Sequence, residues 1–144
     1  MPDPTPARRW RLKRRPQGAL VPDDLELAPF ERAPLRDGHI RVRNIYLSLD
    51  PTHRIWMSDR EQYLPPIEVG STMRGTTIGE VVDSRSDRFK AGDLVVVGLA
   101  GWETETDVAA STAGRVTRRS GVPLTASLSV LGNTGLTAWF GMTR

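Results

Sequence analysis

The sequence contains no cysteine and only two histidines. The lack of cysteine excludes disulfide bonds, thiolate nucleophiles and every cysteine-based zinc or iron–sulfur site. His39 and His53 stand well apart in the sequence, and no pattern of Asp or Glu surrounds both. A lone histidine rarely belongs to a metal ligand set. We therefore interpret both as surface or hydrogen-bonded structural residues and expect no metal site.

Long hydrophobic runs are also missing. The apolar stretch at 94–100 falls far short of the ~20 residues that a helix needs to cross a bilayer. The N-terminus is basic, but it has neither a continuous apolar segment nor a small-residue cleavage site, and so it is not typical of a secretory signal. We expect a cytoplasmic protein with no membrane partner.

Aromatic residues make up only 6% of the chain, whereas the net charge is +3 and the pI is about 9.9. Much of the positive charge lies at 8–15. A nucleic-acid-binding surface would require further basic patches and stacking aromatics. Trp10 and Leu12 alternate with basic residues, which is the period-two pattern of a half-buried strand. We interpret this segment as a strand with a solvated basic edge and expect no nucleic-acid partner.

The sequence does contain many short strand patterns separated by turn residues. Its 144 residues are about the length of one domain. Strands are predicted at 8–15, 25–32 and 39–51, across Gly75 and Gly79 to Val82, at 94–97, and once within 101–119. Glycines inside a strand mark barrel bends or close backbone approaches. We therefore predict a mainly β fold, a compact and partly open β-barrel.

Two segments depart from the strand pattern. Residues 52–70 are polar and interrupted by proline, which predicts a long loop with one helical turn. At 124–142 the pattern becomes compatible with a helix, since Leu136, Trp139 and Phe140 recur at helical spacing. The sequence therefore predicts a C-terminal amphipathic helix.

Four segments carry a family resemblance in their order along the chain: "NIYLSLDPTHR", "MRGTTIGEVVDSRSDRFKAGDLVVV", "GW" and "LGNTGLTAWFGM". Together they resemble the medium-chain dehydrogenase/reductase superfamily. Within this superfamily, they most resemble the zinc-independent branch, which contains prostaglandin reductases, bacterial NADP-dependent curcumin-type reductases and plant alkenal double-bond reductases. The resemblance implies a GroES-like barrel at 1–125. It further implies that 126–144 begin a connecting helix into a Rossmann domain for NADPH.

The nucleotide-binding part of such an enzyme has no counterpart in the sequence. No G-x-G-x-x-G turn occurs, and this is the motif that cradles a pyrophosphate at a helix N-terminus. We therefore expect the chain to correspond to an N-terminal half that lacks its Rossmann domain. On this interpretation the 144 residues alone are inactive in hydride transfer.

The resemblance implies an NADPH-dependent oxidoreductase that reduces the activated C=C bond of enals or enones by hydride transfer. Ser48, Leu49, Arg74, Gly75 and Thr76 stand in the segments where zinc-dependent relatives carry their ligands, so the implied chemistry uses no zinc. The catalytic residues stay unknown. The alternative is a stand-alone GroES-like domain that binds an apolar ligand, or guides a non-redox cyclisation or isomerisation, without nicotinamide.

Three residues of the last motif are implied to bind the cofactor. Thr137 matches a threonine that lies beside the nicotinamide in the family, and Gly135 would allow the backbone to approach it. Asn133 is either a helix cap or a polar group in the site. The structural alternative for Thr137 is a hydrogen bond to the carbonyl four residues earlier in its own helix.

The substrate-binding candidates are Tyr63, Thr52, Met73 and Arg74. Tyr63 lies in the long loop and is predicted to line the pocket, while Met73 and Arg74 precede Gly75 on the strand that the family places at the cleft. Arg74 would meet an anionic group. Thr52 stands where plant double-bond reductases carry a substrate-facing tyrosine, which disfavours a phenolic substrate.

Other motif residues are interpreted structurally. Asp50 and Arg54 are predicted to form a buried ion pair that organises the loop, with substrate contact as the alternative. Tyr46 is assigned to the core, and Trp102 is expected to pack against the barrel. The lack of returning C-terminal strands would expose apolar surface and strand edges. The expected partners are therefore a further copy of the chain or a separate Rossmann half, besides the enal or enone.

Overall fold

The structure is a computed structural model and describes residues 6–143. Its strands are β1 (Arg8–Leu12), β2 (Leu25–Pro29), β3 (His39–Leu47), β4 (Arg74–Ser84), β5 (Leu94–Gly101), β6 (Glu105–Ala109) and β7 (Ala113–Arg115). Its helices are α1 (Thr52–Trp56) and α2 (Asn133–Thr143), with short 3-10 turns η1 (Pro22–Asp24), η2 (Ala110–Thr112) and η3 (Leu124–Leu128). The predicted mainly β fold with a C-terminal helix is confirmed.

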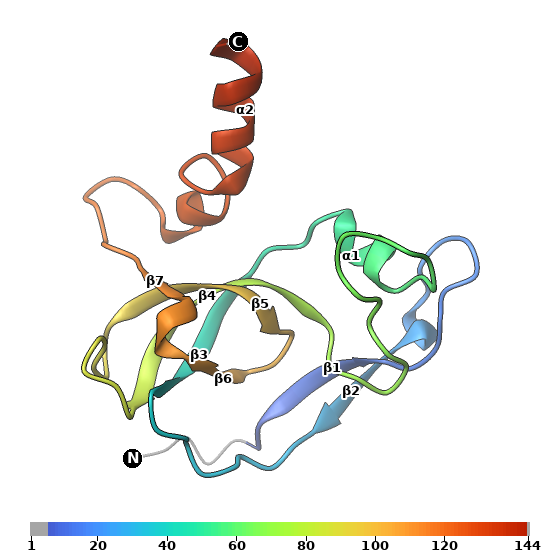
Figure 1. The fold of residues 1–144 in the computed structure, drawn as a ribbon, viewed down its shortest axis with the longest axis horizontal. Coiled ribbons are helices and arrows are strands. Elements are labelled where there is room, and N and C mark those ends of the chain that lie inside the picture. The colour runs from blue at the N-terminus through green and yellow to red at the C-terminus, as the bar shows by residue number, and fades with distance from the viewer. Residues whose placement is uncertain (1–5, 144) are drawn as a thin grey trace.

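The strands form one curled sheet and one two-stranded ribbon. The larger sheet is antiparallel with the order β6-β3-β4-β5-β7, and it wraps into a partly open barrel (Figure 1). β1 and β2 pair beside it, where Trp10 N donates to the Trp102 carbonyl at 2.7 Å. The prediction of one strand within 101–119 is wrong, because these residues form two strands, β6 and β7. The turn at η2 separates them, so that β6 pairs with β3 and β7 pairs with β5.

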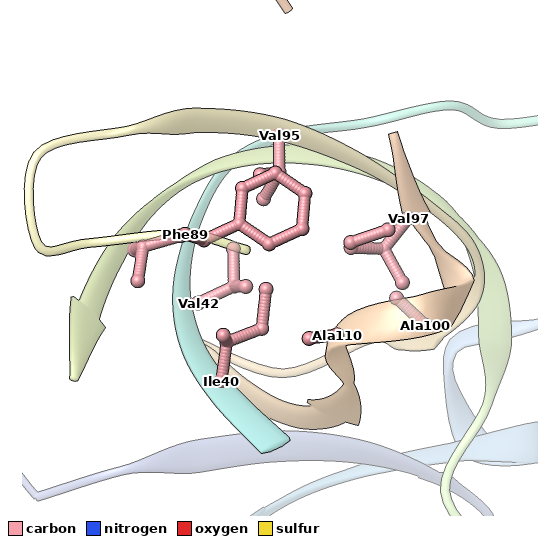
Figure 2. Packing of buried hydrophobic residues seen from close by; sticks show 9 residues of the cluster. Ile40, Val42, Phe89, Val95, Val97, Ala100 and Ala110 are labelled. Atoms are coloured by element: carbon pink, nitrogen blue, oxygen red, sulfur yellow. The ribbon is translucent and has the colours of Figure 1, made fainter. Parts of the chain in front are cut away.

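Alternation along β3 creates the main core. Ile40 and Val42 are fully buried on one face, and Asn44 follows them half-buried. Figure 2 shows the side chains of this cluster pointing into the hollow of the curled sheet. The buried members are Ile40, Val42, Val81, Phe89, Val95, Val97, Ala100, Ala110 and Ala113. Each fully buried aliphatic side chain of this kind stabilises the fold by roughly 1.5–3 kcal/mol.

A second core cluster lies under α1 and β1. It contains Leu12, Trp56, Met57, Ile67 and Met73, with Trp102 packed against it. The expected packing role of Trp102 is thereby confirmed. The predicted single helical turn in the 52–70 loop is also confirmed as α1. Its Trp56 and Met57 supply apolar side chains to this cluster.

The basic N-terminal segment is largely neutralised within the fold. Arg11 pairs with Glu26 at 2.7 Å and Arg14 with the buried carboxylate of Asp24 at 2.7 Å. Period-two alternation in β1 leaves Leu12 buried, in agreement with the predicted half-buried strand. These contacts support the interpretation as a solvated strand edge.

α2 lies apart from the barrel. None of its residues is buried, and Figure 1 shows it projecting from the sheet on the extended segment that follows β7. Trp139 is 65% exposed, so the apolar stripe predicted from the sequence faces outward. No helix among residues 6–143 has the length and apolar character needed to cross a membrane.

Candidate functional site

A large groove of about 1060 Å³ opens between the sheet, the α1 loop and the chain leading to α2. Its size suits a cofactor together with a small organic substrate. The apolar part of its wall includes Trp56, Leu64, Leu99, Val122, Leu128 and Leu131. Residues from three separate parts of the chain therefore line a single cavity.

The structure brings some of the predicted site residues together at this groove. Thr52 and Tyr63, two of the substrate candidates, line it, and so does Asn133 at the start of α2. Thr134, which was not predicted from the sequence, lines it as well. A substrate candidate and a cofactor candidate thus face the same space.

The other predicted residues have local roles. Met73 is fully buried in the second core cluster. The Arg74 guanidinium donates to the Pro65 carbonyl and lies 5.2 Å from the centre of the Trp56 ring. Thr137 Oγ1 donates to the Asn133 carbonyl at 2.8 Å, which is the intrahelical bond given above as its structural alternative. These side chains do not line the groove as the molecule stands.

Gly135 is explained by the backbone around it. A Cβ at this position would overlap the Val130 carbonyl and lie 2.8 Å from Val130 Cα. The glycine therefore lets the start of α2 close against the preceding turn. Its contact with a cofactor stays a prediction.

Tyr63 is a neutral groove residue that can donate a hydrogen bond to a ligand. Its side chain is 70% exposed, and its hydroxyl accepts a hydrogen bond from Trp56 Nε1 at 3.1 Å. Because that bond uses a lone pair of the phenol oxygen, the phenol proton stays available to an acceptor. The edge-to-face contact of the two rings, with centres 6.4 Å apart, holds the phenol beside the groove.

His53 supports the groove wall from behind. It is 5% exposed, and its ring centre lies 5.2 Å from the ring centres of both Trp56 and Trp102. Nδ1 accepts a hydrogen bond from the Asp50 N–H at 3.2 Å. Burial lowers the pKa of His53, and the nearby Asp50 carboxylate opposes this in part. His39 is hydrogen-bonded to the Asp37 carbonyl, so both histidines have the predicted structural character.

The depressed pKa of His53 makes stability depend on pH. The neutral ring is favoured in the folded chain, so its contribution is present above the unfolded pKa of about 6.5 and is lost as pH falls below it. We expect the free energy of unfolding to fall between pH 7 and roughly 5. His53→Gln should have a shallower slope over this interval, measured by urea denaturation at several pH values. Parallel slopes for the two proteins would contradict the assignment. Asp24 and Asp93 titrate below this interval, because their pKa values are lowered from 3.8. Burial raises the pKa of Glu103 from 4.5, which opposes the fall, but it does so in both proteins, so the difference between the two slopes reports His53.

The predicted Asp50–Arg54 pair is wrong. The Arg54 guanidinium donates to the carbonyls of Gly18 and Pro16, at 2.8 and 3.1 Å, and to Ser58. Asp50 instead accepts from Ser48 Oγ at 2.8 Å. The reason is geometric: α1 carries Arg54 toward the turn after β1, whereas Asp50 stays at the groove rim before the helix begins.

The assignment of Tyr46 to the core is also wrong, since its side chain is 44% exposed. β6 covers β3 only from His39 to Arg43, so the last residues of β3 have no strand of the described chain on that edge. Tyr46 borders a smaller pocket of about 330 Å³ with Trp10 and Leu27. This pocket is separate from the groove.

The arginines of the groove were not predicted from the sequence. Arg115, Arg118 and Arg119 line it. The run "RVTRR" is visible in the sequence, but strand and turn signals dominate that region. Among residues 6–143, no three His, Asp or Glu side chains are grouped closely enough to hold a metal ion.

Comparison with known proteins identifies the family. A family model described as the N-terminal domain of oxidoreductase matches residues 8–117. The chain belongs to this family. It is 38% identical over 137 residues to NADPH-dependent curcumin reductase of Escherichia coli (strain K12). This alignment covers 94% of the chain and 39% of that reductase.

Two further relatives support the narrower branch. Prostaglandin reductase 1 of Bos taurus is 30% identical over 138 residues, covering 94% of this oxidoreductase domain and 40% of the relative. The crystal structure of CurA in complex with NADPH from Vibrio vulnificus has a TM-score of 0.85 at 28% identity, again covering 94% and 40%. The predicted resemblance to curcumin-type and prostaglandin reductases is confirmed. The chain spans about 40% of the length of these relatives.

Proposed function

We propose that this chain forms the substrate-binding part of an NADPH-dependent reductase that reduces the activated C=C bond of enals or enones by hydride transfer without zinc. The observation that carries the proposal is the shared groove, in which Tyr63 and Thr52 face the same cavity as Asn133. The NADPH dependence of the curcumin reductase and the NADPH complex of CurA support the cofactor.

The chain's own residues fit a nicotinamide at one end of the groove. Asn133 and Thr134 together offer donors and acceptors that match the carbonyl oxygen and the NH₂ of a carboxamide. NADPH, when bound, would supply the hydride. Thr137 and Gly135 are proposed as further cofactor contacts, and Thr137 would exchange its bond to the Asn133 carbonyl for one to the cofactor.

Tyr63 is proposed to act on the substrate. Its phenol O–H would donate to the substrate carbonyl oxygen and stabilise the negative charge that forms there in the reduction of a conjugated C=C bond. Trp56 and Leu64 line the groove with apolar side chains that would contact the substrate's carbon chain. Thr52 contributes a hydroxyl on the same side of the groove.

The domain division and the partners are part of the proposal. Residues 1–125 form the substrate-binding domain, and 126–144 begin the connection to a nucleotide-binding domain. The exposed apolar side chains of α2 support the prediction of self-association or of a separate Rossmann half as partner. Ligand binding without any dependence on NADPH would favour the stand-alone domain instead.

Calorimetric titration of the 144-residue chain with a medium-chain enone tests the role of Tyr63. We expect Tyr63→Phe to weaken binding about fivefold, because it removes one hydrogen-bond donor from the groove. Tyr46→Phe is the matched control: it makes the same change at the chain's other tyrosine, in the separate pocket, and should leave the affinity unchanged. Equal effects of the two variants, or no binding by the wild type, would contradict the proposal.

A further inference from the structure

The groove has a charged edge that the proposed reduction does not use. Its ionisable lining consists of one carboxylate, Asp50, and the three guanidinium groups of Arg115, Arg118 and Arg119; Tyr63 is the only other titratable group among the described residues that line it. We infer that Arg118 and Arg119 form a subsite for an anionic oxygen group, a carboxylate or a phosphate, on the molecule that occupies the groove. The inference rests on the proposed function and names a chemical feature of the molecule bound in its groove.

Two of the four charges are already engaged inside the protein. Arg115 forms an ion pair with Asp93 at 2.8 Å, donates to the Arg88 carbonyl at 2.8 Å and lies 5.0 Å from the centre of the Phe89 ring. Asp50 accepts the hydrogen bond from Ser48. Among residues 6–143, neither Arg115 nor Asp50 forms an ion pair or a hydrogen bond with Arg118 or Arg119.

Arg118 and Arg119 have exposed side chains with no ion pair or side-chain hydrogen bond to any other residue in 6–143. This separates them from the N-terminal basic segment, where Arg11, Lys13, Arg14 and Arg15 each reach a carboxylate. Two adjacent like charges repel each other, and a bound anion removes that repulsion.

A tight turn holds this pair of arginines at the groove. Val122 N donates to the Arg119 carbonyl at 3.2 Å, and the two residues form an isolated β-bridge. Gly121 closes the turn with φ of +73°, a conformation that favours glycine. The turn therefore defines the backbone conformation at Arg119, which lines the groove next to Arg118.

The surroundings define the chemistry of the ligand. Val122 and Leu128 line the groove near the arginines in sequence, and Tyr63 and Trp56 line it from the α1 loop. Guanidinium groups bind carboxylates and phosphates with charge-assisted hydrogen bonds. The fitting ligand thus combines an apolar chain, a carbonyl for Tyr63 and an anionic group. The anion belongs either to the enone substrate or to the phosphates of NADPH.

The test compares three probes by calorimetry on the full chain: a medium-chain enal, the same enal with a carboxylate at its far end, and NADPH. Each is titrated into the wild type, into Arg118→Gln/Arg119→Gln, and into Arg36→Gln/Arg60→Gln. The last variant is the matched control, because it removes the same amount of charge from two exposed arginines outside the groove.

We expect the wild type to bind the carboxylated enal about tenfold more tightly than the neutral enal, as charge-assisted bonds to one anion imply. The Arg118/Arg119 variant should lose this preference and the control should keep it; added salt should reduce it in the wild type. If instead only NADPH binding weakens in the Arg118/Arg119 variant, the subsite holds a cofactor phosphate.

Other results would overturn the inference. Equal affinity of the wild type for both enals, together with unchanged NADPH binding in the Arg118/Arg119 variant, would refute the anion subsite while leaving the enone proposal intact. Equal losses in both double variants would show a general effect of net charge. Failure of the wild type to bind any probe would refute the proposed function and the subsite together.

Discussion

Gly79→Ala is expected to lower the free energy of unfolding by about 3 kcal/mol, at the upper end of the cost of overpacking a core. Gly79 lies in the central strand β4, opposite Asn44 of β3. A Cβ there would overlap the Arg43 carbonyl oxygen and lie 2.5 Å from Val42 Cγ1. The first obstacle is backbone, so the clash cannot be relieved by rotating a side chain; β3 itself would have to move.

The matched control is Gly98→Ala in the neighbouring strand β5. Apart from Gly98 itself and its two neighbours in the chain, no atom of residues 6–143 would lie within 4 Å of a Cβ added at Gly98, and the φ of Gly98 is not positive. The same substitution there should therefore change stability by less than about 0.5 kcal/mol. Urea denaturation monitored by tryptophan fluorescence measures both variants. A Gly79→Ala protein as stable as the Gly98→Ala protein would show that the close approach of β3 and β4 is not as described.

Ile40→Ala is the second large effect, with an expected loss of about 3 kcal/mol. Ile40 is fully buried in the main cluster, between Val42 and Ala110 in Figure 2. Truncation removes three carbon atoms from a close-packed interior and leaves a cavity that the curved sheet cannot collapse into without breaking its hydrogen bonds. A domain of this size has about 5–15 kcal/mol of stability in total, so the transition should shift markedly.

Ile45→Ala provides the comparison within the same strand. Ile45 is 43% exposed and lies outside the main cluster, at the irregularity in the β3–β4 register, so the same truncation there should cost about 1 kcal/mol or less. Denaturation curves for the two variants measure the difference directly. Similar losses at both positions would contradict the assignment of Ile40 to the core and of Ile45 to the surface.

Local patterns in the sequence predicted most of the fold because alternation, glycine and proline act over short distances. The strand pattern at 39–51 predicted β3, and Gly79 in a strand indicated a close backbone approach. The single turn of α1 followed from the irregular loop pattern. The second strand within 101–119 was missed, because a three-residue strand such as β7 shows no periodicity of its own and forms through its pairing with β5.

Side-chain partners were predicted less well. Asp50 and Arg54 are close in sequence and opposite in charge, but Arg54 instead reaches three acceptors, two of which lie more than thirty residues earlier in the chain. Tyr46 was assigned to the core because it lies in a strand pattern, but β6 pairs with β3 only from His39 to Arg43 and Tyr46 is left exposed. Such side-chain contacts and exposures depend on which distant segments the fold brings together, and a local sequence pattern does not predict them.

The sequence by itself determined the β-rich class, the absence of cysteine chemistry, the C-terminal helix and, through its motifs, the oxidoreductase family, because these depend on composition and local order. Only the tertiary structure decided that Tyr63, Asn133 and the Arg118–Arg119 pair line one groove. It likewise decided that Met73 is core and that Thr137 bonds its own helix. The physical reason is that a site is a convergence of side chains in space, which the curl of the sheet and the path of the chain after β7 create.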